Sequence, residues 1–224
     1  GVYKNMLAHD CHYPALGNHD CIKNGGETFL DDFYLPHNNP QQTERYYSFV
    51  WGNAKFICLD SNSDYKPGSD QHNWMLDELK DREREWLFVF FHHPPWTNMW
   101  DGSYNLPLQK YYHYEGNVDM REYLVPYFEE YKVDFVLNGH SHCYQRGEYH
   151  GVNYVISGGA GVRTLDKHTN DNSPNIQFER QENHYVRWSI NEDQVSWEAV
   201  NIDGDIIDQV TVKKERIFVI QPET

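Results

Sequence analysis

Three short stretches of the chain combine histidine, asparagine and acidic side chains in a pattern that could hold metal ions. Each stretch carries one or two imidazoles, and the first also offers an amide oxygen. Imidazole nitrogen and amide oxygen suit first-row transition metals. A lone histidine pair or a lone Gly-His-x-His is a weak signal, so the prediction depends on all three stretches together. They are Gly17-Asn18-His19-Asp20, His92-His93-Pro94-Pro95-Trp96 and Gly139-His140-Ser141-His142.

The apolar segments before these stretches predict an α/β sheet that would bring the stretches together. Residues 86–91 are apolar throughout, which is typical of a central strand buried on both faces. This run and the next predicted strand, 133–137, each end at a histidine stretch, and open α/β sheets bind ligands beyond the carboxyl ends of their strands. Further predicted elements are strands at 56–60 and 152–156, a helix capped by Ser69 or Asp70, and a helix over 119–131 that Pro126 starts or kinks.

The last part of the chain follows a different pattern. Three short strands are predicted at 184–190, 194–200 and 206–212, and the sequences between them are typical of tight turns. Such an arrangement indicates an antiparallel meander. We therefore predict a single domain over residues 1–224, in which 184–213 supply the closing antiparallel strands of a second sheet.

The composition excludes several classes of protein. The 224 residues include 19 Lys and Arg against 34 Asp and Glu, a formal net charge of −15, which disfavours nucleic-acid and anionic-membrane partners. A mean hydropathy of −0.83 without a long apolar run predicts no transmembrane helix. Four cysteines are too few for a disulfide scaffold. Cys58 is predicted to be a buried thiol, and a bridge between Cys11 and Cys21 stays open because spacing alone cannot decide it.

Longer matches around the three stretches resemble the calcineurin-like metallophosphoesterases, and most closely their purple acid phosphatase branch. The stretches fit that family's Gly-Asn-His-Asp/Glu, His-x-Pro and Gly-His-x-His motifs, and the likeness covers nearly the whole chain. It implies an α/β/β/α sandwich of two mixed sheets flanked by helices. The branch-specific segments are Tyr-His-Tyr-Glu-Gly at 112–116, Gly-His-Ser-His-Cys-Tyr-Gln-Arg at 139–146 and Ser-Gly-Gly-Ala-Gly at 157–161.

The resemblance implies a centre of two metal ions, either iron with zinc or manganese, or two zinc ions. By motif, Asn18, His92 and His140 would bind one ion, and His142 would bind the other. His92 is preferred to its neighbour because it occupies the histidine of His-x-Pro-x-Trp. Two such ions would together activate water for attack on phosphorus.

The resemblance also implies residues that act on the substrate. His19 would donate a hydrogen bond to phosphate or protonate the leaving alkoxide, and Asp20 would orient that imidazole. His93 and His113 are weaker substrate-binding candidates. His113 lies one residue out of register with the branch motif.

Two motifs that the family places before Gly-Asn-His-Asp have no convincing counterpart. These are Asp-x-His and Gly-Asp-x-x-Asp or Gly-Asp-x-x-Tyr, the second of which supplies a carboxylate between the two ions. Asp10-Cys11-His12 spells the first without a preceding strand, and residues 204–208 spell the second inside a predicted hairpin turn. The expectation is an N-terminally truncated enzyme that lacks the first βαβ portion.

The predicted activity is hydrolysis of phosphate monoesters of small molecules, with the chain inactive by itself. One alternative is a phosphodiesterase or nucleotide hydrolase of the same superfamily, and loop 97–116 would decide between the two. The other is a non-catalytic module that binds metal or phosphate. The family favours a secreted or periplasmic location, and the sequence does not fix the oligomeric state.

Overall fold

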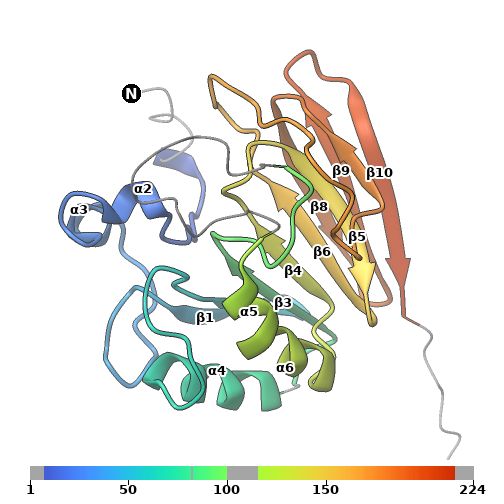
Figure 1. The fold of residues 1–224 in the computed structure, drawn as a ribbon. Coiled ribbons are helices and arrows are strands. Elements are labelled where there is room, and N and C mark those ends of the chain that lie inside the picture. The colour runs from blue at the N-terminus through green and yellow to red at the C-terminus, as the bar shows by residue number, and fades with distance from the viewer. Residues whose placement is uncertain (1–7, 82, 100–115, 215–224) are drawn as a thin grey trace, which may run out of the picture.

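The computed structural model of the protein describes residues 8–81, 83–99 and 116–214, which form helices and two stacked sheets (Figure 1). In these ranges one sheet has seven strands in the order β1-β2-β3-β4-β6-β5-β7, and the other has three in the order β10-β9-β8. The strands are β1 (Tyr47–Trp51), β2 (Ala54–Cys58), β3 (Trp86–Phe91), β4 (Phe135–Asn138), β5 (Tyr144–Tyr149), β6 (Val152–Ser157), β7 (Phe178–Arg180), β8 (His184–Ile190), β9 (Gln194–Asn201) and β10 (Ile206–Lys213). The helices are α2 (Asn18–Cys21), α3 (Glu27–Asp32), α4 (Asp70–Lys80), α5 (Val118–Tyr123) and α6 (Val125–Glu130).

The centre of the large sheet is parallel and carries the strands that the apolar runs predict. Strands β2, β3, β4 and β6 pair in parallel, whereas β1, β5 and β7 pair antiparallel at the two edges. The strand predicted at 86–91 is confirmed with the same bounds as β3. Its side chains alternate between two cores, because Leu87 and Val89 face one core while Trp86 and Phe88 face the other.

Helices α4, α5 and α6 cover one face of the large sheet (Figure 1). Helix α4 begins after Ser69, whose hydroxyl accepts a hydrogen bond from the His72 amide at 3.2 Å, and it buries Met75 and Leu79. The single helix predicted over 119–131 is instead two helices. The break falls at Leu124, and Pro126 lies in the first turn of α6, where a missing N–H is tolerated.

The closing sheet packs on the other face of the large sheet (Figure 1). Its three strands confirm the predicted meander. The outer strands β8 and β10 expose many of their residues, whereas β9 between them alternates mostly between buried and half-buried residues, because one face is solvated. The sandwich of two sheets with helices is therefore confirmed. Two details differ from the expected α/β/β/α form within the described ranges: the closing sheet is purely antiparallel, and no described helix covers its outer face.

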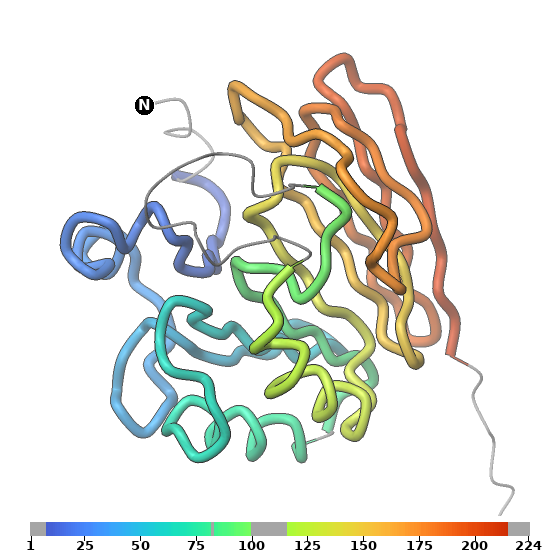
Figure 2. The backbone as a smooth tube through the Cα atoms, viewed as in Figure 1, coloured from blue at the N-terminus to red at the C-terminus, as the bar shows by residue number. Residues whose placement is uncertain are grey.

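Figure 2 shows residues 8–33, in blue, at the opposite side of the view from the closing strands, and Leu16 and Phe29 of this segment share a buried cluster with Tyr47 of β1 and Cys58 of β2. Cys11 and Cys21 both have free thiols in the structure, and Cys58 is fully buried, as predicted for that residue. Burial raises the pKa of the Cys58 thiol.

No helix in the described part of the chain is both long and apolar enough to span a membrane.

A buried ionic network joins the two sheets directly behind the Gly-His-Ser-His stretch. The Asp208 carboxylate on β10 accepts hydrogen bonds from Arg146 at 2.5 and 3.0 Å and from the Tyr144 hydroxyl at 2.7 Å. That hydroxyl in turn accepts a hydrogen bond from the Trp197 indole at 2.9 Å. Burial alone would raise the pKa of Asp208, but the hydrogen bonds from Arg146 and Tyr144 outweigh it and lower the pKa. Asp208 is thus a structural carboxylate.

Replacing Asp208 with alanine is expected to lower the free energy of unfolding by about 3 kcal/mol, because the half-buried Arg146 charge loses its partner. Urea denaturation of the two proteins would measure this difference. Asp205→Ala is the matched control, since Asp205 is exposed in the turn before β10 and should change stability by less than about 0.5 kcal/mol. Equal losses in both variants would contradict a structural role for the network.

Candidate metal centre

Three sequence-distant residues meet at the carboxyl ends of neighbouring strands. His92 follows β3 and His140 lies two residues after β4, and these strands pair in parallel. The Gly139 amide donates a hydrogen bond to the His92 carbonyl at 3.1 Å, which holds the two strand ends side by side. Asn18 is the first residue of α2. The structure thus brings the predicted ligands Asn18, His92 and His140 to one point.

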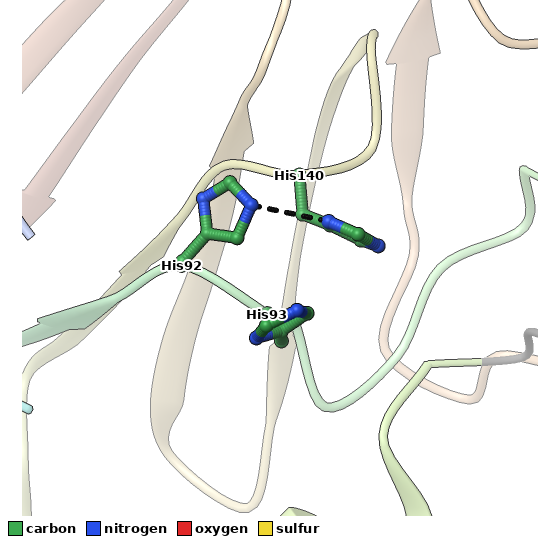
Figure 3. Close-up of side chains that lie close together, drawn as sticks. All are labelled: His92, His93 and His140. Carbon is green, nitrogen blue, oxygen red and sulfur yellow. Dashed lines mark hydrogen bonds between the residues drawn. The ribbon is translucent and has the colours of Figure 1, made fainter. Parts of the chain in front are cut away.

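The donor atoms of this group lie within a few ångströms of one another. The Asn18 Oδ1 atom is 2.8 Å from His92 Nε2 and 3.3 Å from His140 Nδ1, and the two ring nitrogens are 3.1 Å apart. Figure 3 shows the His93 imidazole beside the other two rings, and its centroid is 4.5 Å from that of His140. One ring nitrogen from each of the three histidines falls within 4.8 Å of the others. Nitrogen and oxygen donors this close together are suited to a transition-metal ion.

The backbone around the cluster is specialised to allow this approach. His140 has a φ of 63°, in the left-handed region that residues other than glycine rarely adopt. A Cβ atom on Gly17 would lie 3.1 Å from the His92 ring, so a side chain there would press on the imidazole. Backbone strain of this kind is concentrated at functional sites, where the surrounding structure maintains it.

The environment keeps the clustered imidazoles neutral. Burial, followed by the charges of neighbouring histidines, lowers the pKa of His92 to about 3 and that of His140 to about 2. Burial also lowers the pKa of His93 to about 4, against a smaller opposing effect of Asp60. Neutral imidazole is the form that binds metal ions, so all three rings are ready to act as ligands at mildly acidic pH.

The metal-free protein is therefore expected to lose stability as the pH falls from 6.5 to about 4.5. In this window the unfolded imidazoles bind protons while the folded ones do not, so the free energy of unfolding falls by up to ~4 kcal/mol per pH unit for three histidines. Thermal denaturation in the presence of a chelator would measure it. His93→Phe should reduce the slope by about one third, and an unchanged slope in that variant would contradict the shifted pKa of His93.

Two of the remaining predicted residues, His19 and His142, lie near the cluster. The charges of His19 and His142 both lower the pKa of His92 and His140, which places them close to the centre. His19 is exposed on α2, whereas His142 lies in the loop that leads to β5. His113 lies outside the described residues.

The structure gives Asp20 a contact different from the one predicted. Its carboxylate accepts a hydrogen bond from the Gly17 amide at 2.8 Å and so fixes the turn that presents Asn18. A hydrogen bond between Asp20 and His19 is not found among the described residues, so the orienting role of Asp20 stays a prediction.

Other residues that support the site had no signal in the sequence. The Ser61 hydroxyl lies 2.8 Å from His93 Nδ1, and the Asn62 amide donates to the Leu16 carbonyl at 3.0 Å just before the Gly-Asn-His-Asp stretch. The fully buried Asp60 pairs with Arg45 at 3.1 Å. These residues follow β2 at the same edge of the sheet, where the sequence shows only an acidic residue at the end of an apolar run.

The two segments that spell the missing family motifs, residues 10–12 and 204–208, do not contribute to the cluster. Asp10 and His12 contact each other, and both lie outside the group of possible ligands found among the described residues. Asp208 is held in the ionic network between the sheets. The group therefore contains imidazoles next to an amide oxygen, with no carboxylate from the described part of the chain.

Comparisons with known proteins point to one family. The sequence model of the calcineurin-like phosphoesterase family matches residues 2–144. A purple acid phosphatase of Glycine max is 35% identical over 165 residues, which are 68% of this chain and 33% of that protein. Purple acid phosphatase 18 of Arabidopsis thaliana is 38% identical over 104 residues, 45% of this chain and 21% of that protein. The chain thus spans a third or less of the length of these relatives.

Solved structures share the fold at lower sequence identity. A purple acid phosphatase from yellow lupin (Lupinus luteus) seeds superposes with a TM-score of 0.70 at 20% identity, covering 88% of this chain and 37% of that one. GAP50, described as the anchor in the inner membrane complex of Plasmodium, gives a TM-score of 0.60 at 13% identity, covering 77% and 55%. The family match includes all three histidine stretches. The chain belongs to the calcineurin-like phosphoesterase family.

Proposed function

We propose that this chain supplies part of a two-metal centre that hydrolyses phosphate monoesters of small molecules. The observation that supports the proposal is the convergence of Asn18 Oδ1 with His92 Nε2 and His140 Nδ1, at 2.8 and 3.3 Å. An amide oxygen and two neutral imidazoles form a suitable donor set for one ion. His142 would bind a second ion, and iron with zinc or manganese, or two zinc ions, would serve.

The chain's own residues would carry out the remaining tasks. Metal ions bound here would polarise the phosphoryl group and lower the pKa of water. His19, exposed at the start of α2, would donate a hydrogen bond to the phosphate or a proton to the departing alkoxide. Asp20 holds the turn that aims Asn18 at the cluster. Ser61 fixes the ring of His93, which would face the substrate oxygen atoms.

The proposal is tested by assaying the 224-residue chain alone and a longer form in which a segment taken from a relative supplies the family's two aspartate motifs. The chain by itself is expected to bind zinc but to hydrolyse an aryl phosphate poorly, because the described cluster includes no carboxylate to bridge two ions. The longer form is expected to turn over the same substrate with a metal requirement. Absence of turnover in the longer form would overturn the proposal.

A second candidate function is a non-catalytic module that binds metal or phosphate. It is favoured by the purely imidazole and amide composition of the described cluster. The same assay separates the two candidates, since a binding module would retain phosphate in the presence of zinc without hydrolysing any ester. A phosphodiesterase would instead release a phenol from a bis-aryl phosphate faster than from the monoester.

A further inference from the structure

Residues 164–166, which have no predicted function, hydrogen-bond the loop that carries His142. Asp166 lies 24 residues after His142, in the polar region that follows the Ser157–Gly161 segment. Its carboxylate Oδ2 accepts a hydrogen bond from the His142 amide at 2.7 Å, and its own amide donates to the His142 carbonyl at 3.1 Å. The Asp166 side chain is only 12% exposed, so water competes little for these contacts. Asp166 thus hydrogen-bonds both the N–H and the carbonyl group of His142.

The same segment also controls the His142 side chain. The Thr164 carbonyl lies 3.2 Å from His142 Nδ1. A carbonyl oxygen can only accept, so Nδ1 must carry the proton in this contact. In a neutral imidazole the other nitrogen, Nε2, then holds the free lone pair. The remaining Asp166 oxygen, Oδ1, lies 3.9 Å from Nδ1 and favours the same tautomer electrostatically.

The other side of the loop is packed tightly by backbone contacts, so Asp166 supplies the contact that a side-chain substitution can change. The Gly158 amide donates to the Cys143 carbonyl at 3.0 Å, and a Cβ atom on Gly158 would lie 2.0 Å from the Ser141 carbonyl oxygen. These contacts are between backbones. The Asp166 carboxylate is the only side chain of the described residues that hydrogen-bonds the His142 backbone.

We propose that Asp166 is a positioning residue for His142, which pins residues 164–166 against the loop so that Nδ1 donates to the Thr164 carbonyl and Nε2 stays open as a metal ligand. The inference rests on the proposed function only in assigning a metal ion to Nε2. Partners that fix the ring orientation of a ligating histidine typically contribute 10–100-fold to metal affinity.

The experiment uses the 224-residue chain with ¹⁵N-labelled histidine, and nitrogen chemical shifts report the tautomer of His142 without metal. The wild-type ring is expected as Nδ1–H with an unprotonated Nε2. Asp166→Asn keeps an acceptor for the His142 amide and should keep that tautomer. Asp166→Ala should convert it to a mixture. Asp171→Ala is the control, because Asp171 is an exposed carboxylate of the same segment that pairs with His168 and should change nothing at His142.

A zinc titration of the same samples gives the second readout. In the wild type and in Asp166→Asn, zinc should shift the Nε2 signal of His142, and Asp166→Ala should need ~10–100-fold more zinc for the same shift. A wild-type His142 with its proton on Nε2 would overturn the inference even if Asp166→Ala failed to fold. So would an unchanged tautomer in a folded Asp166→Ala protein. The expected tautomers with no response of His142 to zinc would instead count against the two-metal function and leave the positioning role standing.

Discussion

Zinc binding by the chain is expected to fall by at least ~100-fold when His140 is replaced with alanine, because the loss of a direct ligand should exceed the 10–100-fold effect of losing a supporting partner. His140 Nδ1 lies within 3.3 Å of both Asn18 Oδ1 and His92 Nε2, so removing it breaks the centre of the donor set. Isothermal titration with zinc, together with metal analysis at equal protein concentration, would measure the change.

The control for this variant is His37→Ala. His37 is an exposed histidine before β1, and its loss should leave zinc affinity unchanged. Circular dichroism would verify that both variants are folded. If His140→Ala bound zinc as tightly as the control, the cluster of Asn18, His92 and His140 would not be a metal site.

His19→Ala is expected to lower kcat by ~10²–10⁴-fold in the smallest form of the protein that shows phosphatase activity, while its metal content stays the same. The reason is that His19 is assigned to the leaving group and lies exposed, whereas the half-buried rings of His92 and His140 are the proposed metal ligands. Assays with two aryl phosphates that differ in leaving-group pKa would measure the effect. The better leaving group should lose less activity.

This result can be distinguished from a simple loss of metal. His140→Ala should lose metal and activity together, and a better leaving group should not restore the activity. If His19→Ala lost metal in proportion to activity with both substrates, His19 would be a ligand, and the Gly17-Asn18-His19-Asp20 turn would serve only to bind the ion.

Much of the fold was predictable where burial leaves a periodic or continuous apolar pattern. Strand β3 was predicted with its bounds, and the three closing strands were predicted within one residue. Strand β1 was missed, and so was β5, whose sequence Tyr-Gln-Arg-Gly-Glu-Tyr does not alternate in hydrophobicity. Strand β7 has three residues and exists through its pairing with β5. Such segments are strands because of their neighbours, so local sequence does not reveal them.

The candidate site, like the fold, has a part that the sequence predicts and a part that it does not. The strand-end positions of His92 and His140 follow from the apolar runs before them, and the loop motif adds Asn18. The contacts of Ser61 with His93 and of Asp166 with His142 could not be predicted, because neither Ser61 nor Asp166 belongs to a motif and their loops meet the histidines only in the folded chain. The Thr164 contact uses a backbone carbonyl, which any residue type would offer at that position. Information of this kind resides in the tertiary fold.

The long sequence separations within the Asn18, His92 and His140 cluster have a consequence for how the chain folds. Asn18 is 74 residues from His92 and 122 from His140, so the site has a high contact order and closes only after β3 and β4 have paired. An ion that recognises the closed site alone would stabilise the native state by mass action, by ~2.7 kcal/mol at a free concentration 100 times its Kd. The supply of metal would then determine how long the folded protein resists proteolysis, in addition to whether its site is loaded.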